Sequence, residues 1–139
     1  MAHTPFPVAI LTPDGEVFSE EVEMVSTKTV VGSIGVLANH SPLLAMLDPA
    51  ELRLHRSEGG DVVRFAQAEG YLQVAHDGSV LLLVEEAHDV DSLNASDLQE
   101  RLQQAERELQ DAGEDTERRR VAERSQRRFE TFLKLAQGG

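Results

Sequence analysis

The chain has 139 residues and a mass of 15.3 kDa, the size of one domain or of a small domain with an appendage, which excludes a multidomain enzyme. Lys and Arg number 13 against 25 Asp and Glu, so the net charge of −12 repels phosphate backbones and argues against nucleic-acid binding. Because cysteine is absent, disulfides, thiolate nucleophiles and Cys-ligated metals are excluded. The longest apolar runs have five residues, so we expect neither a secretion signal nor direct membrane insertion.

The composition changes along the chain in a way that marks a domain boundary. Residues 1–90 contain 14 acidic and 4 basic residues, whereas residues 91–139 contain 11 acidic and 9 basic residues. All five prolines precede residue 50, and helical patterning begins soon after residue 90. The sequence therefore predicts two domains, residues 1–89 and residues 90–139.

Short β-type segments separated by turns fill the first domain. The expected strands are Val8–Leu11, Val17–Phe18, Val22–Thr27, Ile34–Leu37, Leu43–Leu47, Leu52–Arg56, Val62–Ala66, Tyr71–Ala75 and Val80–Val84. Gly-containing turns connect several of them, as in Thr12–Gly15 and His76–Ser79. The last segment has no polar face, which predicts a central strand covered on both sides. This pattern predicts an antiparallel β-sandwich.

Helical periodicity follows in the second domain. One apolar stripe comprises Leu98, Leu102, Ala105, Leu109 and Ala112, and a second comprises Val121, Phe129, Phe132, Leu133 and Ala136. Ser96 with Gln99 predicts a capping box at the first helix, and Gly113 predicts its end. We therefore expect an α+β protein: an N-terminal antiparallel β-sandwich followed by a C-terminal antiparallel hairpin of two helices.

Residue types that carry catalysis are present without a catalytic pattern. The histidines show no spacing typical of a metal site, and the glycine-rich segment around Gly35 lacks the features of a phosphate-binding loop. His40, which precedes Ser41 and Pro42, is expected to bond the backbone of its own loop. We expect no catalytic residue, no metal and no cofactor.

Six arginines gather on the second predicted helix: Arg118, Arg119, Arg120, Arg124, Arg127 and Arg128. Two interpretations of these arginines stay open. In the first, most of them form ion pairs with glutamates of the two helices. In the second, they form a surface that docks on an acidic protein.

Four segments in order resemble the epsilon subunit of bacterial F-type ATP synthases: Pro13–Phe18, Gly32–Leu44, Gly70–Val74 and Val80–Ala87. The central motif of that family is matched at Gly32, Ile34, Gly35, Val36, Leu37, His40, Pro42, Leu43 and Leu44. The resemblance is close over residues 8–90 and continues as a pattern over residues 91–139.

The resemblance implies a non-catalytic subunit of the rotating central stalk, peripheral at the cytoplasmic face of the cell membrane. Its sandwich would bind the gamma subunit and the c-ring, with proton flow coupled to ATP synthesis. The interface residues implied are Ser33, Ile34, Gly35, His40 and Pro42. The helical arm would inhibit ATP hydrolysis by extending to the catalytic beta and alpha subunits, and replacing Arg124, Arg127 and Arg128 by alanine would relieve that inhibition.

Four positions depart from the family pattern, and the first is Glu69, which stands where relatives usually have a glycine before Gly70. Ala38 replaces a proline, and Ser33 stands where some relatives have an acidic residue, which weakens or replaces a charged contact with the c-ring. Some family members bind ATP through a motif whose arginine is replaced here by Asn94, and asparagine supplies no cation for a phosphate.

Two other classes of protein remain as alternatives. One is a free-standing interaction module whose helical arm dimerises, although Leu98, Leu102 and Leu109 do not sustain a heptad repeat. The other is a small β-barrel lyase that uses His40 with acidic neighbours. Bound metal without binding to gamma would favour the enzyme.

Overall fold

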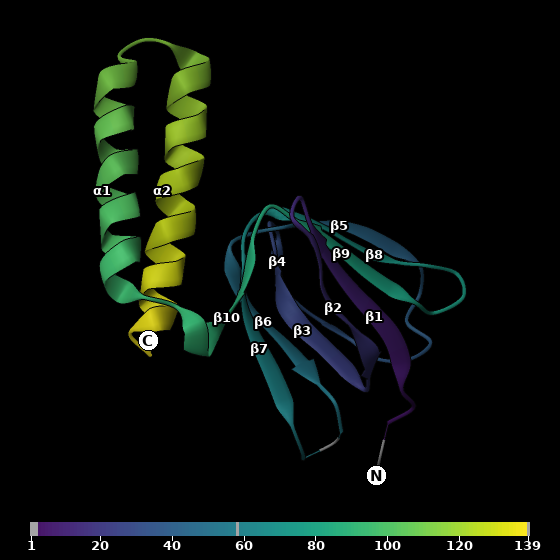
Figure 1. Cartoon of the computed structure of the whole chain (residues 1–139). Helices are drawn as coiled ribbons and strands as arrows, with labels where there is room; N and C mark the ends of the chain where they lie inside the picture. The colour runs from purple at the N-terminus through teal and green to yellow at the C-terminus, as the bar shows by residue number, and fades with distance from the viewer. Residues whose placement is uncertain (1–2, 58, 139) are drawn as a thin grey trace. The chain divides into compact units, whose positions relative to one another are not determined.

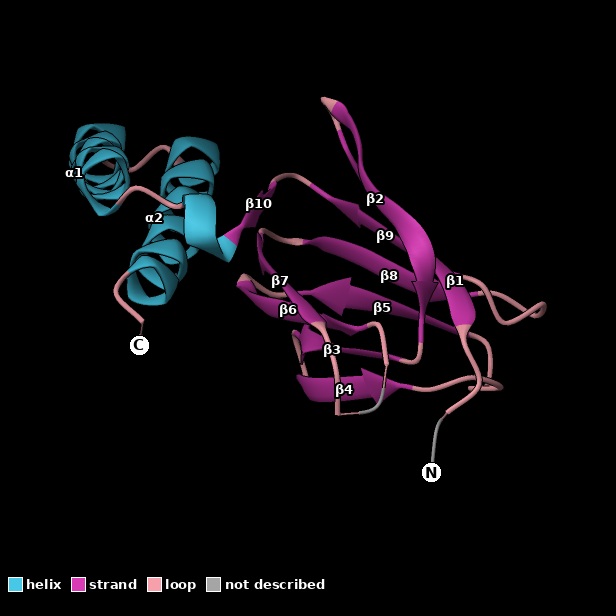
Figure 2. Cartoon of the chain, turned by 60° about the horizontal axis from the view of Figure 1, so that its bottom comes forward, coloured by secondary structure: helices cyan, strands magenta, loops and turns pink. Residues whose placement is uncertain are grey.

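A computed structural model describes residues 3–57 and 59–138, which form two compact units that divide between Asp89 and Val90 (Figure 1). The strands of the first unit are β1 (Phe6–Thr12), β2 (Gly15–Val22), β3 (Met24–Thr29), β4 (Gly32–Val36), β5 (Leu43–Leu47), β6 (Ala50–His55), β7 (Val62–Gln67), β8 (Gly70–Val74), β9 (Val80–Val84) and β10 (Ala87–Asp89). The second unit contains the short 3-10 helix η1 (Val90–Ser92), α1 (Ala95–Ala112) and α2 (Thr116–Ala136). Figure 2 separates these strands and helices by colour.

The first unit, called the sandwich below, consists of two layers of strands. One layer has the order β2-β1-β9-β8-β5, and the other has the order β10-β7-β6-β3-β4. A single pairing between Thr29 of β3 and Leu47 of β5 joins them. All described strand pairs are antiparallel except β1 with β9, which is parallel. The predicted fold class is therefore confirmed, with one parallel pair that the sequence did not indicate.

The core between the layers follows from alternation along each strand. Every second residue of β6 is buried, so Leu52 and Leu54 lie inside while Arg53 is exposed. Phe18 and Phe65 meet edge to face with ring centroids 6.1 Å apart. This aromatic pair anchors one strand from each layer in the shared core.

The prediction that both faces of Val80–Val84 are covered is wrong. In β9, Leu82 is fully buried, but Leu83 is 45% exposed and Leu81 is half-buried. The strand is central in its layer, between β8 and β1. In a sandwich only the inner face of a layer meets the other layer, so a central strand still presents alternate residues outward.

The second unit, called the hairpin below, is built from α1 and α2, which run antiparallel and pack against each other (Figure 1). Gly113 ends α1 with φ of 55°, a left-handed conformation that glycine adopts without strain. The core contains the buried residues Leu98, Leu102, Ala105, Ala112, Ala122 and Phe132. Phe132 is fully buried, which makes it the largest side chain of this small core.

Two details of the helix prediction are wrong. The cap of α1 is Asn94, whose Oδ1 accepts a hydrogen bond from the Asp97 amide at 3.1 Å, so Ser96 lies inside the first turn. Val121 is 47% exposed, and its neighbour Ala122 is buried instead. Adjacent helical residues are about 100° apart, so a one-position error in the stripe exchanges an inner residue for an outer one.

A cluster of three charged side chains lies on β6 and β7. The carboxylate of Glu51 accepts hydrogen bonds from Arg53 and Arg64, and its side chain is only 19% exposed. Burial alone raises the pKa of Glu51, but the hydrogen bonds from Arg64 and Arg53 outweigh it and hold the pKa below its ordinary value of 4.5. The ionised form of Glu51 is therefore favoured in the folded state.

We expect Glu51→Gln to weaken the pH dependence of stability in acid. The pKa of Glu51 is lower in the folded than in the unfolded chain, so its stabilising effect is complete at neutral pH and is lost as pH falls below about 4.5. At neutral pH the variant should be only about 0.5–1 kcal/mol less stable, because the Arg53 and Arg64 side chains are 52% and 40% exposed and solvent screens both pairs. Urea unfolding from about pH 7 to pH 3 checks this. Parallel pH profiles for the two proteins would contradict the prediction.

Candidate partner-binding surfaces

The predicted interface residues on β4 alternate between surface and core. Ser33 and Gly35 are exposed, whereas Ile34 is half-buried and packs against the sandwich core. Gly35 has no side chain, and a Cβ at this position would approach the end of the Met24 side chain to 3.1 Å. Ser33 and Gly35 therefore stand on the surface, and Ile34 holds their strand in place.

His40 and Pro42 lie in the loop that follows β4. Nδ1 of His40 is 2.7 Å from the Ser41 carbonyl oxygen, to which it donates, and the His40 amide donates to the Leu37 carbonyl at 3.3 Å. Asn39 has a φ of 65°, which Asn tolerates better than most residues. His40 thus orders its own loop, as the sequence predicted. Of the five predicted residues, three therefore lie on β4 and two in the loop that directly follows it.

Sequence reasoning missed an apolar surface on the outer face of the β2-β1-β9-β8-β5 layer. The strand register aligns Met46 with Tyr71, Tyr71 with Leu83, and Leu83 with Leu11. Leu44, Met46, Tyr71 and Leu83 are 68%, 55%, 49% and 45% exposed. We call Leu11, Leu44, Met46, Tyr71 and Leu83 the apolar band. Alternation of Leu44 and Met46 along β5 was the signal that could have indicated it.

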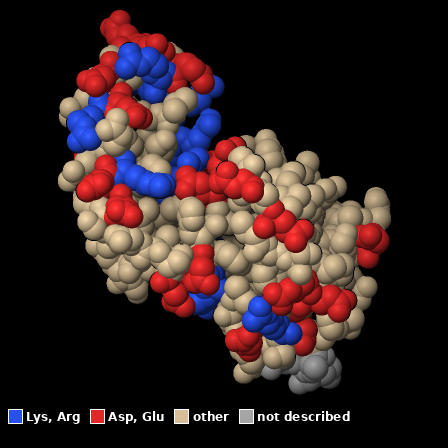
Figure 3. All heavy atoms as spheres, in the orientation of Figure 1, with Lys and Arg blue, Asp and Glu red and all other residues tan. Residues whose placement is uncertain are grey.

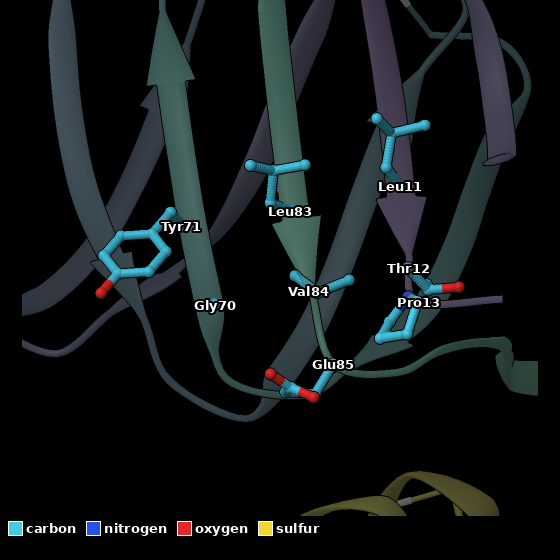
Figure 4. A pocket seen from close by; sticks show the side chains of 8 residues that line it. All are labelled: Leu11, Thr12, Pro13, Gly70, Tyr71, Leu83, Val84 and Glu85. Atoms are coloured by element: carbon cyan, nitrogen blue, oxygen red, sulfur yellow. The ribbon is translucent and has the colours of Figure 1, made fainter. Parts of the chain in front are cut away.

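The apolar band has a hollow at one end. The cavity measures about 320 Å³ and is lined by Leu11, Thr12, Pro13, Gly70, Tyr71, Leu83, Val84 and Glu85. Figure 4 shows Tyr71, Leu83 and Leu11 in a row on three neighbouring strands, with Glu85 below the row, past the end of the strand that carries Leu83. The lining of the hollow is mostly apolar, with the Glu85 carboxylate at its rim, so the hollow is suited to bind an apolar side chain of a partner protein.

The predicted arginines of α2 lie mainly on the surface of the hairpin. Arg119 contacts Glu123 at 3.7 Å and Arg120 contacts Glu117 at 3.6 Å, so part of the set forms the predicted glutamate pairs. Within the part of the chain that the structure describes, Arg118 and Arg124 are exposed and form no ion pair. Figure 3 shows the basic side chains of the hairpin interspersed with acidic ones.

Arg128 differs from the other arginines because it is half-buried. Its guanidinium carbon lies 5.9 Å from the centre of the Phe129 ring, and that of Arg101 lies 5.7 Å from the same ring. Burial lowers the pKa of Arg128. Arg101 belongs to α1 and Phe129 to α2, so the contact between them links the two helices. Because Arg128 is half-buried against the same ring, it contributes to the hairpin structure as well as to its charge.

The position of Asn94 does not suit binding of ATP through the arginine-containing motif. Its side-chain oxygen is used to cap α1, and an amide at this position offers no positive charge to a phosphate. Among the described residues, no cluster of histidine and carboxylate side chains is suited to hold a metal ion. None of the described helices combines the length and apolar character needed to cross a membrane.

Together, these observations define a β-sandwich protein with a helical appendage whose prominent surfaces are suited to protein contacts. Residues 5–90 match the sequence model of the family described as ATP synthase, Delta/Epsilon chain, beta-sandwich domain. An ATP synthase epsilon chain from a Sulfurihydrogenibium species is 35% identical over 127 residues, covering 91% of this chain and 93% of that one. This chain belongs to the ATP synthase delta/epsilon chain family, and the family predicted from its motifs is confirmed.

Further similarity appears in sequence and in structure. The ATP synthase epsilon chain of Bacillus cytotoxicus is 40% identical over 108 residues, which cover 76% of this chain and 77% of the relative. A chain of the Euglena gracilis mitochondrial ATP synthase F1/c-ring structure aligns with a TM-score of 0.73 and 24% identity, covering 91% of this chain and 78% of that one. A chain of the Tetrahymena thermophila mitochondrial ATP synthase central stalk/c-ring structure aligns with a TM-score of 0.65 and 16% identity, covering 96% and 98%. These two likenesses establish that the fold is shared.

Proposed function

We propose that this chain is a non-catalytic subunit of the central stalk of a proton-translocating ATP synthase and helps to couple rotation to ATP synthesis. The sandwich binds the gamma subunit and the membrane-embedded c-ring. The hairpin inhibits ATP hydrolysis through contacts with the catalytic beta and alpha subunits. The subunit is peripheral, at the cytoplasmic face of the cell membrane. Membership of the ATP synthase delta/epsilon chain family supports this proposal.

The apolar band is the observation that carries the proposal. Large apolar side chains in adjacent positions on four neighbouring strands leave a continuous apolar surface in contact with water, which costs free energy unless a partner covers it. Tyr71 at its centre is a residue type that often dominates the binding energy of interfaces. We assign the band to the gamma subunit, because an epsilon-type subunit that rotates with gamma needs a permanent, apolar contact with it.

The loop from β4 to β5 contributes the second contact of the sandwich. Ser33 and Pro42 are exposed, and His40 holds the loop through its backbone contacts. In the proposal these residues, with Gly35 beside them and Ile34 as their support, face gamma and the c-ring. None of them is Asp, Glu, Lys or Arg, which predicts contacts that depend on shape more than on carboxylate ion pairs.

Inhibition by the hairpin should depend on Arg118 and Arg124, which are exposed and without ion pairs among the described residues. We expect the double variant Arg118→Ala, Arg124→Ala to need about tenfold more protein for half-inhibition of ATP hydrolysis, because two contacts to acidic partners are lost. Arg128 is left in place since it also supports the hairpin through Phe129. The matched control, Arg107→Ala with Lys134→Ala, removes the same charge from other parts of the hairpin. Equal inhibition by both double variants would contradict the prediction.

The proposed function is tested by titrating the full chain into a gamma-containing ATPase head from which this subunit has been removed. We expect saturable binding together with reduced ATP hydrolysis. Binding without inhibition would restrict the chain to a coupling role. Absence of binding would contradict the proposal and favour a free-standing interaction module.

A further inference from the structure

The apolar band contains a methionine that is open to water. Of the three methionines in the chain, Met24 and Met46 belong to the described residues. Met46 on β5 is 55% exposed. Met24 on β3 is half-buried, and the end of its side chain lies beside Gly35, 3.1 Å from the place of a Cβ there. Oxidation of methionine follows access to the thioether, so small oxidants in water reach Met46 more readily than Met24.

Backbone contacts on both sides fix the position of Met46. On one side β5 pairs with β8, with Met46 directly opposite Tyr71. On the other side the Met46 carbonyl accepts a hydrogen bond from the Val30 amide at 3.0 Å. Directly opposite residues of an antiparallel pair have Cβ atoms about 4.5–5.5 Å apart, so the side chains of Met46 and Tyr71 are neighbours on the outer face. A chemical change at Met46 therefore stays within the apolar band.

Oxidation by a peroxide changes this side chain from apolar to polar. A lone pair on the Met46 sulfur forms a bond to one oxygen of hydrogen peroxide, and the O–O bond breaks. The transferred oxygen gives its proton to the departing hydroxide, which leaves as water. Sulfur loses two electrons and the peroxide gains them. The product is methionine sulfoxide, which thiol-dependent reductases convert back to methionine.

We propose that Met46 is a reversible oxidation site for peroxide and that its sulfoxide form binds the gamma subunit weakly. This inference rests on the proposed function, in which gamma covers the apolar band. Burying the sulfoxide oxygen removes its water and costs free energy unless a donor replaces that water. Within the apolar band only the Tyr71 hydroxyl is a side-chain donor, since Leu11, Leu44 and Leu83 have none. Oxidation thus acts on the unassembled subunit, and bound gamma protects the same sulfur.

The first test locates the sulfoxide after treatment of the full chain with hydrogen peroxide. Tryptic cleavage after Lys28 places Met24 and Met46 in different peptides, and mass spectrometry follows each of them with time. We expect Met46 to be oxidised at least about fivefold faster than Met24. Binding of the gamma-containing ATPase head should slow oxidation of Met46 at least about fivefold. Equal rates for the two methionines, or an unchanged rate for Met46 in the complex, would overturn the inference.

The second test measures the affinity of the oxidised chain for a gamma-containing ATPase head that lacks this subunit. We expect the chain with sulfoxide at Met46 to bind about tenfold more weakly, and methionine sulfoxide reductase to restore its affinity. Met46→Leu keeps an apolar side chain without sulfur, so its affinity should not change on peroxide treatment. The matched control Met24→Leu should remain as sensitive to peroxide as the wild type.

The outcomes separate this inference from the proposed function. Equal affinities of the untreated chain and the chain oxidised at Met46 would overturn the inference and leave the proposed function intact. Loss of affinity in peroxide-treated Met46→Leu would assign the sensitivity to another residue and overturn the inference as well. Failure of the untreated wild-type chain to bind the head would contradict the proposed function itself.

Discussion

Replacing Phe132 with alanine is expected to unfold the hairpin while leaving the sandwich folded. Phe132 is fully buried and is the largest side chain in a core otherwise made of leucines and alanines. Truncation of a buried phenylalanine costs about 3–5 kcal/mol, and a hairpin of two helices has little stability in reserve. Far-UV circular dichroism should show most of the helical signal lost, with the β signal retained.

A matched control distinguishes loss of the core from loss of any apolar residue in α2. Val121→Ala changes a side chain that is 47% exposed, so the helical signal should be retained. The free energy of unfolding of this variant should lie within about 0.5 kcal/mol of the wild-type value. The same pair of variants also tests inhibition, since Phe132→Ala should bind the ATPase head without inhibiting it. Full helicity and full inhibition in Phe132→Ala would show that Phe132 is dispensable to the hairpin.

Gly70→Ala should be the most damaging small substitution in the sandwich. A Cβ at Gly70 would lie 2.0 Å from the Leu83 carbonyl oxygen and 2.7 Å from the Val84 Cα. Both atoms belong to the backbone of β9, which pairs with β8, so no side chain is able to move aside. We expect a loss of about 3 kcal/mol or more in the free energy of unfolding, measured by urea denaturation.

The control for this prediction is Gly35→Ala. There a Cβ would meet only the flexible end of the Met24 side chain, at 3.1 Å, so the cost should stay below about 1 kcal/mol. Equal stability losses in the two variants would contradict the reading of Gly70 as a backbone contact. We expect the Gly70→Ala variant also to bind gamma more weakly, because Tyr71 and Leu83 of the apolar band lie on the two strands that the added Cβ pushes apart.

Local sequence was sufficient for the elements whose signals lie within a few residues. Short β-type segments and turns such as Thr12–Gly15 indicated most strands, and Gly113 indicated the end of α1. β10 was missed because Ala87–Asp89 has no β-branched or aromatic residue, and its pairing with β7 is decided by residues distant in sequence. Gln67 is a similar case: it is fully buried and donates to the Asp48 carbonyl at 2.9 Å, a contact with no local pattern.

The surfaces were predicted less completely than the fold. Motif residues such as Ser33 and His40 were found by family resemblance, and the structure reports their exposure and contacts. The apolar band was missed since its members come from four strands, and only strand order and register bring Met46, Tyr71 and Leu83 into one row. For the arginines, sequence spacing left both pairing and docking open, and the side-chain contacts distinguish Arg119 and Arg120 from Arg118 and Arg124.

The central claim is that the apolar band attaches this subunit to the gamma subunit of an ATP synthase. It is tested most directly by the affinity of Tyr71→Glu, relative to the wild type, for the gamma-containing ATPase head lacking this subunit. Tyr71 is 49% exposed, so the variant should fold, and a buried, unpaired charge at the centre of the interface should weaken binding about 100-fold. Equal affinities for the variant and the wild type would contradict the account.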